Sequence, residues 1–310
     1  MTRIWKTTQA PDYVGIFILL IIWILIVNLV KPFHRLFFLD DHAISYPHTE
    51  HERVTSCMSP NPSLNGNTLT LAAMSFVYGF FVPFLLLSIW NLLHPRSSIF
   101  KLQASLISLS ISALVTLCIT DTVKNLVGRP RPDLLARCQP DRASLQPGVP
   151  LSIDACTAPH DASLHDGWRS FPSGHSSFSF AGLGYLSFFF AGQLRIFRPA
   201  HDGGGRDLVR AMLCFIPLVG AAFVALSRWE DYRHDAIDIS TGSILGFCTA
   251  YWSYRRYWPR LSSQACDEPY PQPNDGAQSA TWARVRDEEE GGTNVGHQLQ
   301  LVERVRATSN

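Results

Sequence analysis

Six long runs of apolar residues dominate this sequence and limit what it can fold into. They cover residues 13–30, 69–93, 102–123, 175–192, 209–226 and 236–254. Runs of about 18 or more apolar residues are typical of transmembrane helices, because a helix of that length crosses a hydrocarbon core of about 30 Å. The fourth and sixth runs contain Ser, Thr and Gly, which favours packing inside a bundle. The sequence therefore predicts an all-α, six-transmembrane helical bundle over residues 13–258.

The two ends of the chain are interpreted separately. A cleaved signal peptide is the alternative for the first run, but the run is longer than a typical signal core, and Lys31 and Pro32 follow it where a small-residue cleavage site would be needed. Residues 1–12 are predicted to be a cytoplasmic N-terminus. Residues 259–310 contain several prolines and an acidic run, and they are predicted to form a disordered cytoplasmic tail.

Charge sets the orientation and excludes one class of partner. The net charge is +1 and only 16% of residues are charged, which is unlike a nucleic-acid-binding domain. Arg and Lys flank the runs at residues 3–6, 96–101, 195–210 and 255–260, all on one side of a six-span chain. The positive-inside rule makes that side cytoplasmic.

Cys138 and Cys156 then fall in non-cytoplasmic loops, where a disulfide between them is one pairing that the sequence allows.

Three polar clusters interrupt the apolar runs, and all three are predicted at the non-cytoplasmic boundary. The first contains Lys124 and Arg131 at the end of the third run. Basic residues that only snorkel toward the membrane surface are the alternative interpretation. The second contains Ser173, Gly174 and His175 at the start of the fourth run. A helix N-terminus with free N–H groups is a ready site for an anion, whereas an ordinary capped helix with an exposed His is the alternative.

The third cluster contains Arg228, His234 and Asp238, between the fifth and sixth runs. His234 and Asp238 are four residues apart, so a helix would place them on one face. An Asp that accepts from one imidazole nitrogen fixes the tautomer and leaves the other nitrogen free to attack. A proton relay or a metal site are the alternatives, but nearby cations repel a metal and attract an anion.

Together the clusters supply what metal-free phosphoryl transfer requires. Cations neutralise phosphate oxygens, one His attacks phosphorus, and the other His moves the proton. No cofactor or metal is expected. The phosphate-binding candidates are Lys124, Arg131, Ser173, Gly174 and Arg228.

The clusters resemble the three-part motif of the type-2 phosphatidic acid phosphatase, or lipid phosphate phosphatase, superfamily. That motif is Lys, six residues and Arg-Pro, then Pro-Ser-Gly-His, then Ser-Arg, five residues, His, three residues and Asp. The resemblance covers roughly residues 12–255 and is nearest to the eukaryotic branch that includes fungal diacylglycerol pyrophosphate phosphatases. It implies His234 as the nucleophile, Asp238 as its orienting partner and His175 as the general acid. Asp235 departs from many relatives in that branch, which carry a second His there.

The resemblance implies hydrolysis of phosphatidate, diacylglycerol pyrophosphate or lysophosphatidate by a membrane enzyme. Six spans with a cytoplasmic N-terminus place the three clusters, and so the expected active site, on the lumenal or extracellular face. The vacuole, the endoplasmic reticulum and the plasma membrane are the membranes expected. A sphingoid-base phosphate or dolichyl diphosphate is the alternative substrate, because the motif is shared. A soluble vanadate-dependent haloperoxidase shares the pocket chemistry, but the apolar runs argue against it. A catalytically silent lipid-binding scaffold is the non-enzyme alternative.

Overall fold

The computed structural model of this chain describes residues 9–48, 75–95, 97–143, 145–198 and 208–270, and within these ranges it is helical. No strand occurs in this described part, where pairing is limited to an isolated bridge between Phe37 and Leu151. The long helices are α2 (Ala10–Leu29), η2 and α5 (Val77–Phe81 and Val82–Leu93), α6 (Ile99–Val127), α9 (Gly174–Gln193), α10 (Leu208–Glu230) and α11 (Ala236–Tyr257). The all-α prediction is confirmed, and each apolar run coincides with one of these helical segments, except that residues 69–74 lie outside the described residues.

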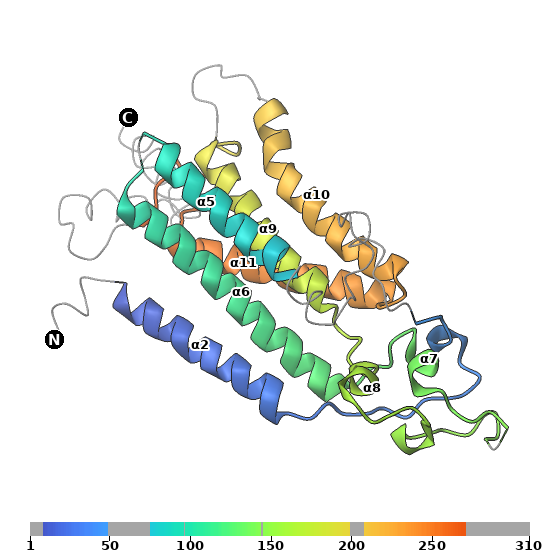
Figure 1. Cartoon of the computed structure of the whole chain (residues 1–310). Coiled ribbons are helices and arrows are strands. Elements are labelled where there is room, and N and C mark those ends of the chain that lie inside the picture. The colour runs from blue at the N-terminus through green and yellow to red at the C-terminus, as the bar shows by residue number, and fades with distance from the viewer. Residues whose placement is uncertain (1–8, 49–74, 96, 144, 199–207, 271–310) are drawn as a thin grey trace, which may run out of the picture.

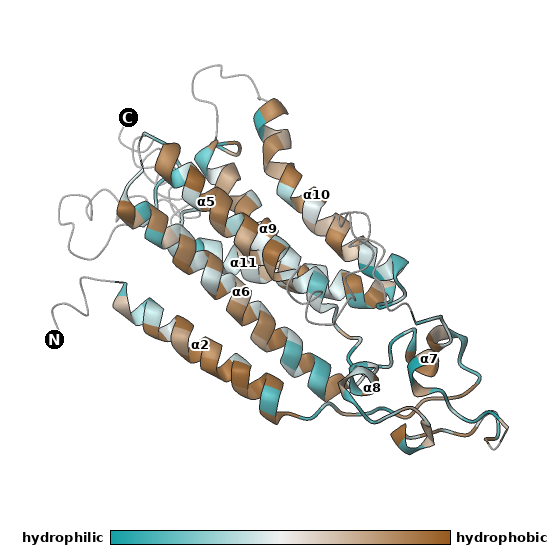
Figure 2. Cartoon of the chain, viewed as in Figure 1, coloured by the Kyte–Doolittle hydropathy of each residue, from teal (hydrophilic) through white to brown (hydrophobic). Residues whose placement is uncertain are grey.

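Three of these helices are long and apolar enough to cross a membrane, namely α2, α6 and α10. Apolar residues run along most of their lengths (Figure 2), and many on α2 and α10 are exposed. A soluble protein would not leave such surfaces in water, so this is a membrane protein. Val77–Leu93 is apolar but shorter. Helices α9 and α11 carry more polar and small side chains, and much of α9 is buried among its neighbours.

Helix α9 is the centre of the bundle, and it packs against α6, α10, α11 and η2. Glycines let two of these neighbours approach closely. A Cβ on Gly246 of α11 would overlap the backbone carbonyl of Ser177, and a Cβ on Gly182 would overlap the carbonyl of Gly79. Small residues at such crossings allow the dispersion contacts that hold helices together where no water is available to drive association.

Hydroxyl groups add hydrogen bonds between the buried helices. Ser108 of α6 donates to the carbonyl of Ser253 on α11 at 2.8 Å, and Ser253 donates back to the carbonyl of Ser108 at 2.6 Å. About two turns further along α6, the hydroxyl of Thr116 lies 2.5 Å from the hydroxyl of Thr249 on α11. Such bonds contribute roughly 0.6 kcal/mol each in membrane bundles, and they fix the register of α6 against α11.

A small polar and disulfide-bonded cap covers one end of the bundle (Figure 1). It contains residues 30–48, α7 (Leu134–Cys138), α8 (Ala162–Asp166) and the short turns η1 (His42–Ile44) and η3 (Ile153–Ala155). Cys138 and Cys156 form a disulfide with their Cα atoms 4.6 Å apart. Trp168 is fully buried, and its indole N–H donates to the carbonyl of Arg35 at 2.9 Å. The cap has its own apolar core and lies where α6 ends and where α9 and α11 begin.

The first part of the predicted tail packs against the opposite end of the bundle. Cys266 is fully buried, and Asp267 accepts from Arg195 at 2.6 Å and from Gln193 through its carbonyl at 3.1 Å. Residues 259–270 are therefore held by contacts with the end of α9, which composition alone does not reveal. The remaining tail, residues 271–310, lies outside the described residues.

Candidate active site

Lys124 lies in the last turn of α6, where the helix brings it to the cap end of the bundle. The helix stops at Gly128, whose φ of 57° is in the left-handed region that glycine tolerates. The Lys124 ammonium donates to the carbonyl of Arg169 at 3.2 Å. A Cβ placed on Gly174 would lie 3.5 Å from the Lys124 Nζ atom. The first polar cluster therefore borders the second directly.

Arg131 follows in the extended segment after α6, and its guanidinium joins the cap to the third cluster. Its Nε donates to the carbonyl of Asp166 at 2.9 Å, and its Nη2 donates to the Asp166 carboxylate at 3.0 Å. Its Nη1 donates to the carbonyl of Arg233 at 3.3 Å. The side chain is nearly buried, so its charge acts in a place where water screens it weakly.

The second cluster forms the N-terminus of α9. Ser173 is the N-cap, and its hydroxyl accepts from the backbone N–H of Ser176 at 3.4 Å. The backbone N–H of Ser173 donates to the carbonyl of Asp238, which joins this turn to the start of α11. The His175 Nε2 atom is buried and has no hydrogen-bond partner among the described residues. A helix N-terminus with its partial positive charge is thus placed beside an imidazole that has a free position.

The third cluster spans the turn between α10 and α11. Arg228 lies in the last turn of α10, where its guanidinium contacts the carboxylate of Asp231 at 3.2 Å and the hydroxyl of Ser227 at 3.0 Å. The backbone N–H of His234 donates to the carbonyl of Arg228 at 3.3 Å. The His234 side chain is only 2% exposed, so the turn holds the imidazole inside the site.

Asp238 lies close to His234 but makes its hydrogen bonds elsewhere. The Asp238 Oδ2 atom is 3.7 Å from His234 Nδ1, which is longer than a hydrogen bond. The same carboxylate accepts from the Ser170 hydroxyl at 2.5 Å, from Arg129 Nη1 at 2.7 Å and from the backbone N–H of Asp235 at 3.1 Å. The predicted proximity of the two side chains is present, and the predicted direct bond between them is not formed.

Three residues of this site were not predicted from sequence. Arg129 lies between Lys124 and Arg131 in the sequence but was not among the predicted site residues, although a carboxylate buried at a helix start needs a donor, which points to a nearby cation. Ser170 and Asp166 lie in a segment without periodicity, so nothing in the sequence indicates that they face Asp238 and Arg131. The eight predicted catalytic and phosphate-binding residues lie within one region, at the adjoining ends of α6, α9, α10 and α11.

Burial and nearby charges together lower three pKa values outside the membrane-spanning segments. Burial, with Arg131 and Lys124 nearby, lowers the pKa of His234 well below its ordinary 6.5, so its imidazole is neutral near pH 7. Burial, with Arg131 and Arg137, lowers the pKa of Arg233 to about 10, which leaves it cationic. Burial alone would raise the pKa of Asp166, but these arginines hold it well below its ordinary value. The site therefore combines a neutral imidazole with excess positive charge.

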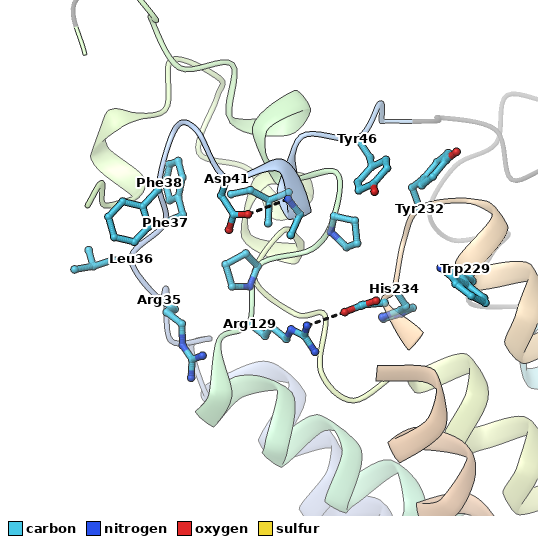
Figure 3. Close-up of a pocket in the computed structure, with 15 residues that line it drawn as sticks. Arg35, Leu36, Phe37, Phe38, Asp41, Tyr46, Arg129, Trp229, Tyr232 and His234 are labelled. Atoms are coloured by element: carbon cyan, nitrogen blue, oxygen red, sulfur yellow. Dashed lines mark hydrogen bonds and ion pairs between the residues drawn. The ribbon is translucent and has the colours of Figure 1, made fainter. Parts of the chain in front are cut away.

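A cavity of about 410 Å³ opens beside His234 (Figure 3). Tyr46 and Tyr232 stack at its rim with ring centroids 4.7 Å apart. Arg129 points from this cavity toward the turn that carries His234, whereas Arg35 points away from it. The remaining lining residues come from the segment after α2, the segment after α6, the last turn of α10 and the turn before α11, namely Leu36, Phe37, Phe38, Asp41, Ala43, Ile44, Pro130, Pro132, Trp229 and Asp235.

Comparison with known proteins agrees with this arrangement. The model of the PAP2 superfamily matches residues 105–262, which include all three clusters. Diacylglycerol pyrophosphate phosphatase 1 of Saccharomyces cerevisiae is 41% identical over 283 residues, which is 87% of this chain and 89% of that protein. A probable diacylglycerol pyrophosphate phosphatase 1 of Schizosaccharomyces pombe is 39% identical over 79% of each chain. Lipid phosphate phosphatase 2 of Arabidopsis thaliana is 33% identical over 79% of this chain and 76% of that protein. No solved structure matches significantly. The chain belongs to the PAP2 superfamily.

Proposed function

We propose that this chain is a membrane phosphatase that hydrolyses lipid phosphates through a phosphohistidine intermediate on His234. The observation that carries the proposal is the meeting of three cations, a helix N-terminus and two imidazoles at one end of a membrane bundle. The fungal and plant relatives are named as phosphatases of diacylglycerol pyrophosphate and lipid phosphates. Phosphatidate and diacylglycerol pyrophosphate are therefore the first substrates to test.

In the first step, a neutral His234 attacks the phosphorus of the substrate. Its Nδ1 faces Asp238 at 3.7 Å, so Nε2 is the nitrogen that attacks. The bond from phosphorus to the lipid oxygen breaks, and His175 donates a proton to that leaving oxygen. Lys124, Arg131 and Arg228 offset the charge on the phosphoryl oxygens as the transition state forms.

In the second step, His175 removes a proton from water, and the water oxygen attacks the phosphorus of phosphohistidine. The bond from His234 Nε2 to phosphorus then breaks, which releases inorganic phosphate and restores both imidazoles. The three cations and the α9 N-terminus supply the positive charge that a metal ion would otherwise provide, so we propose that hydrolysis needs no metal. Activity that survives a chelator would support this, and loss of activity that magnesium restores would contradict it.

A second cavity favours a substrate with an acyl chain. This apolar groove, of about 500 Å³, lies between η2 and α5, α9 and α10. Val224 is four residues before Arg228 and Leu213 is fifteen residues before it, so the groove runs from about 6 Å to about 22 Å below the phosphate site along α10. The groove therefore begins in the leaflet on the side of the phosphate site and extends past the middle of a hydrocarbon core of about 30 Å. The lining residues are Tyr78, Val82, Leu86, Trp90, Leu183, Leu186, Phe190, Leu194, Leu213, Ile216, Pro217, Gly220, Phe223 and Val224.

We propose that residues 13–258 form one six-span phosphatase domain with both termini in the cytoplasm and the active site on the lumenal or extracellular side. In support, α2, α6 and α10 end at the cap, whereas α9 and α11 begin there (Figure 1). A disulfide in the cap suits an oxidising compartment. The membranes proposed are the vacuole, the endoplasmic reticulum and the plasma membrane. Protease protection of tags at each terminus and in the cap would test this orientation.

The decisive experiment is phosphate release by the purified chain and by the variants His234→Ala and His175→Ala. Both variants should lose activity, and acid-labile phosphate on the chain should be absent in His234→Ala. Full activity of His234→Ala would remove the nucleophile assignment. A wild-type chain that binds lipid phosphates without releasing phosphate would instead favour the lipid-binding scaffold. A panel with sphingoid-base phosphate and dolichyl diphosphate would separate the alternative substrates.

A further inference from the structure

Arg129 bridges two carboxylates at the start of α11. Its Nη1 lies 2.7 Å from Asp238 Oδ1, and its Nη2 lies 3.0 Å from Asp235 Oδ2. The Asp238 side chain is fully buried, whereas the Asp235 side chain is 47% exposed. Arg129 reaches them from the extended segment after α6, along the wall of the cavity beside His234 (Figure 3). Its planar fork matches this double contact, which a point-like ammonium cannot make.

The bridge determines where the Asp238 charge lies relative to His234. Arg129 occupies Oδ1, while the Ser170 hydroxyl and the Asp235 N–H occupy Oδ2. Within the part of the chain that the structure describes, the donors to this buried carboxylate are thus residues other than His234, whose Nδ1 lies 3.7 Å away. A buried carboxylate without its cation must bind a proton or find another positive partner, because an unpaired charge is costly to bury. The nearest group able to become such a partner is the His234 imidazole.

The other charged groups around His234 do not take the place of Arg129 as the cation that binds Asp238. They come from every neighbouring element, and most of them favour a neutral imidazole. They are Lys124 of α6, Arg131 of the segment after α6, Asp166 of α8, His175 of α9, Arg228 of α10, and Arg233 and Asp238 on either side of His234. Arg131 is committed to Asp166, and Arg228 to Asp231, so Arg129 is the cation that contacts Asp238 within the described residues.

We propose that Arg129 is a positioning residue for the phosphatase reaction, which holds the Asp238 carboxylate ionised and in place so that His234 remains a neutral, correctly oriented nucleophile. The inference rests on the function proposed above. When Arg129 is removed, Asp238 and His234 form an ion pair, and the imidazole holds its proton to a higher pH. A protonated imidazole has no lone pair for attack at phosphorus. The acid limb of activity therefore moves to higher pH, while binding of the phosphate group to Lys124 and Arg131 is retained.

The test compares Arg129→Gln, Arg129→Lys and the matched control Arg35→Gln. Arg35 lines the same cavity, is exposed and points away from His234, so Arg35→Gln removes the same charge without touching the bridge. The measurements are kcat and KM for phosphate release across acidic and neutral pH. For Arg129→Gln we expect kcat to fall about 10- to 100-fold at neutral pH, which is the usual loss when a residue that orients a reacting side chain is removed. KM should stay within about threefold of the wild-type value. The acid limb should move up by about one pH unit.

The remaining variants distinguish a positioning role of Arg129 from a role in folding. Arg129→Lys keeps the charge and should recover part of kcat, whereas a residue needed only for packing would not be rescued this way. Ser170→Ala removes another donor to Asp238 and should shift the acid limb in the same direction. Thermal unfolding of each variant reports loss of fold. An unchanged acid limb in a folded Arg129→Gln, or an equal change in Arg35→Gln, would overturn the inference. A wild-type chain without phosphatase activity would overturn the proposed function instead.

Discussion

Filling the apolar groove at Gly220 should make the enzyme discriminate against long acyl chains. Gly220 lines the groove on α10, and the nearest atom to a Cβ placed there is Leu183 Cδ1 at 3.7 Å. A Cβ therefore fits, and the ring of Gly220→Phe would project into the space beyond it. Gly220 is eight residues before Arg228, so the ring would lie about 12 Å below the phosphate site.

The size of the effect follows from this geometry. A palmitoyl chain that enters the groove extends well past the level of Gly220, whereas a hexanoyl chain only just reaches it. Crowding of a packed apolar site costs about 1–3 kcal/mol. That cost corresponds to a loss of about 5- to 150-fold in kcat/KM for the long chain. The loss is in orientation more than in affinity, because lipid tails outside the groove are as apolar as its walls.

The assay is phosphate release from dipalmitoyl and dihexanoyl phosphatidate in mixed micelles. Gly220→Phe should lower kcat/KM for the dipalmitoyl substrate by the amount above and leave the dihexanoyl value within about twofold, since the chemistry is untouched. Val219→Phe is the matched control, because Val219 is the adjacent residue and is 67% exposed on the outer side of α10. Equal losses for both substrates, or equal losses in both variants, would refute the groove as an acyl-chain site.

Four further predictions concern stability and pH. Replacing Cys138 and Cys156 by Ser should lower the free energy of unfolding by roughly 3 kcal/mol, measured by denaturant titration in detergent, because their disulfide closes a loop with a sequence separation of 18. Gly246→Val should lower the melting temperature sharply, since its Cβ would overlap a backbone carbonyl of α9 that cannot withdraw. Because arginines hold the pKa of Asp166 below its ordinary 3.8, its stabilising contribution is complete above that pH and is lost as pH falls below it, which acid unfolding of Asp166→Asn against the wild type would measure. The acid limb of kcat/KM should lie below pH 6.5 because the pKa of His234 is lowered in the free enzyme; an acid limb above that value would contradict a neutral nucleophile.

Helix positions were predictable because they depend on local properties of the sequence. Apolar runs mark the helices, and residues such as Ser173 and Asp235 at helix starts and Gly128 after a helix end mark their limits. The cap and residues 259–270 were not predictable in the same way. They are held by contacts between distant segments, such as the bond from Trp168 to Arg35, and such contacts leave no period in the sequence.

The candidate site was partly predictable for a related reason. Residues such as Lys124, His175 and His234 lie at the ends of apolar runs, where a polar residue at a membrane boundary stands out from its surroundings. The partners of Asp238 do not stand out. Ser170 is a single small polar residue in an irregular segment, and the choice of Arg129 over Arg131 depends on the path of the backbone after α6. The four-residue spacing predicted that His234 and Asp238 lie close together. It could not show that the Asp238 carboxylate would accept its hydrogen bonds from other residues.

Asp238 belongs to the N-terminal cap of α11 and also lies beside His234. It is the third residue of α11, where its carboxylate accepts from the Asp235 N–H, while the Asp235 side chain accepts from the N–H groups at the start of the helix. This capping box stabilises α11 by about 1 kcal/mol. Asp238→Asn would therefore change helix stability and the charge beside His234 together. Asp235→Ala removes the capping oxygen and leaves the contact between Arg129 and Asp238 in place. If a folded Asp235→Ala keeps kcat while Asp238→Asn loses it, the loss belongs to the charge near His234 and not to the helix cap.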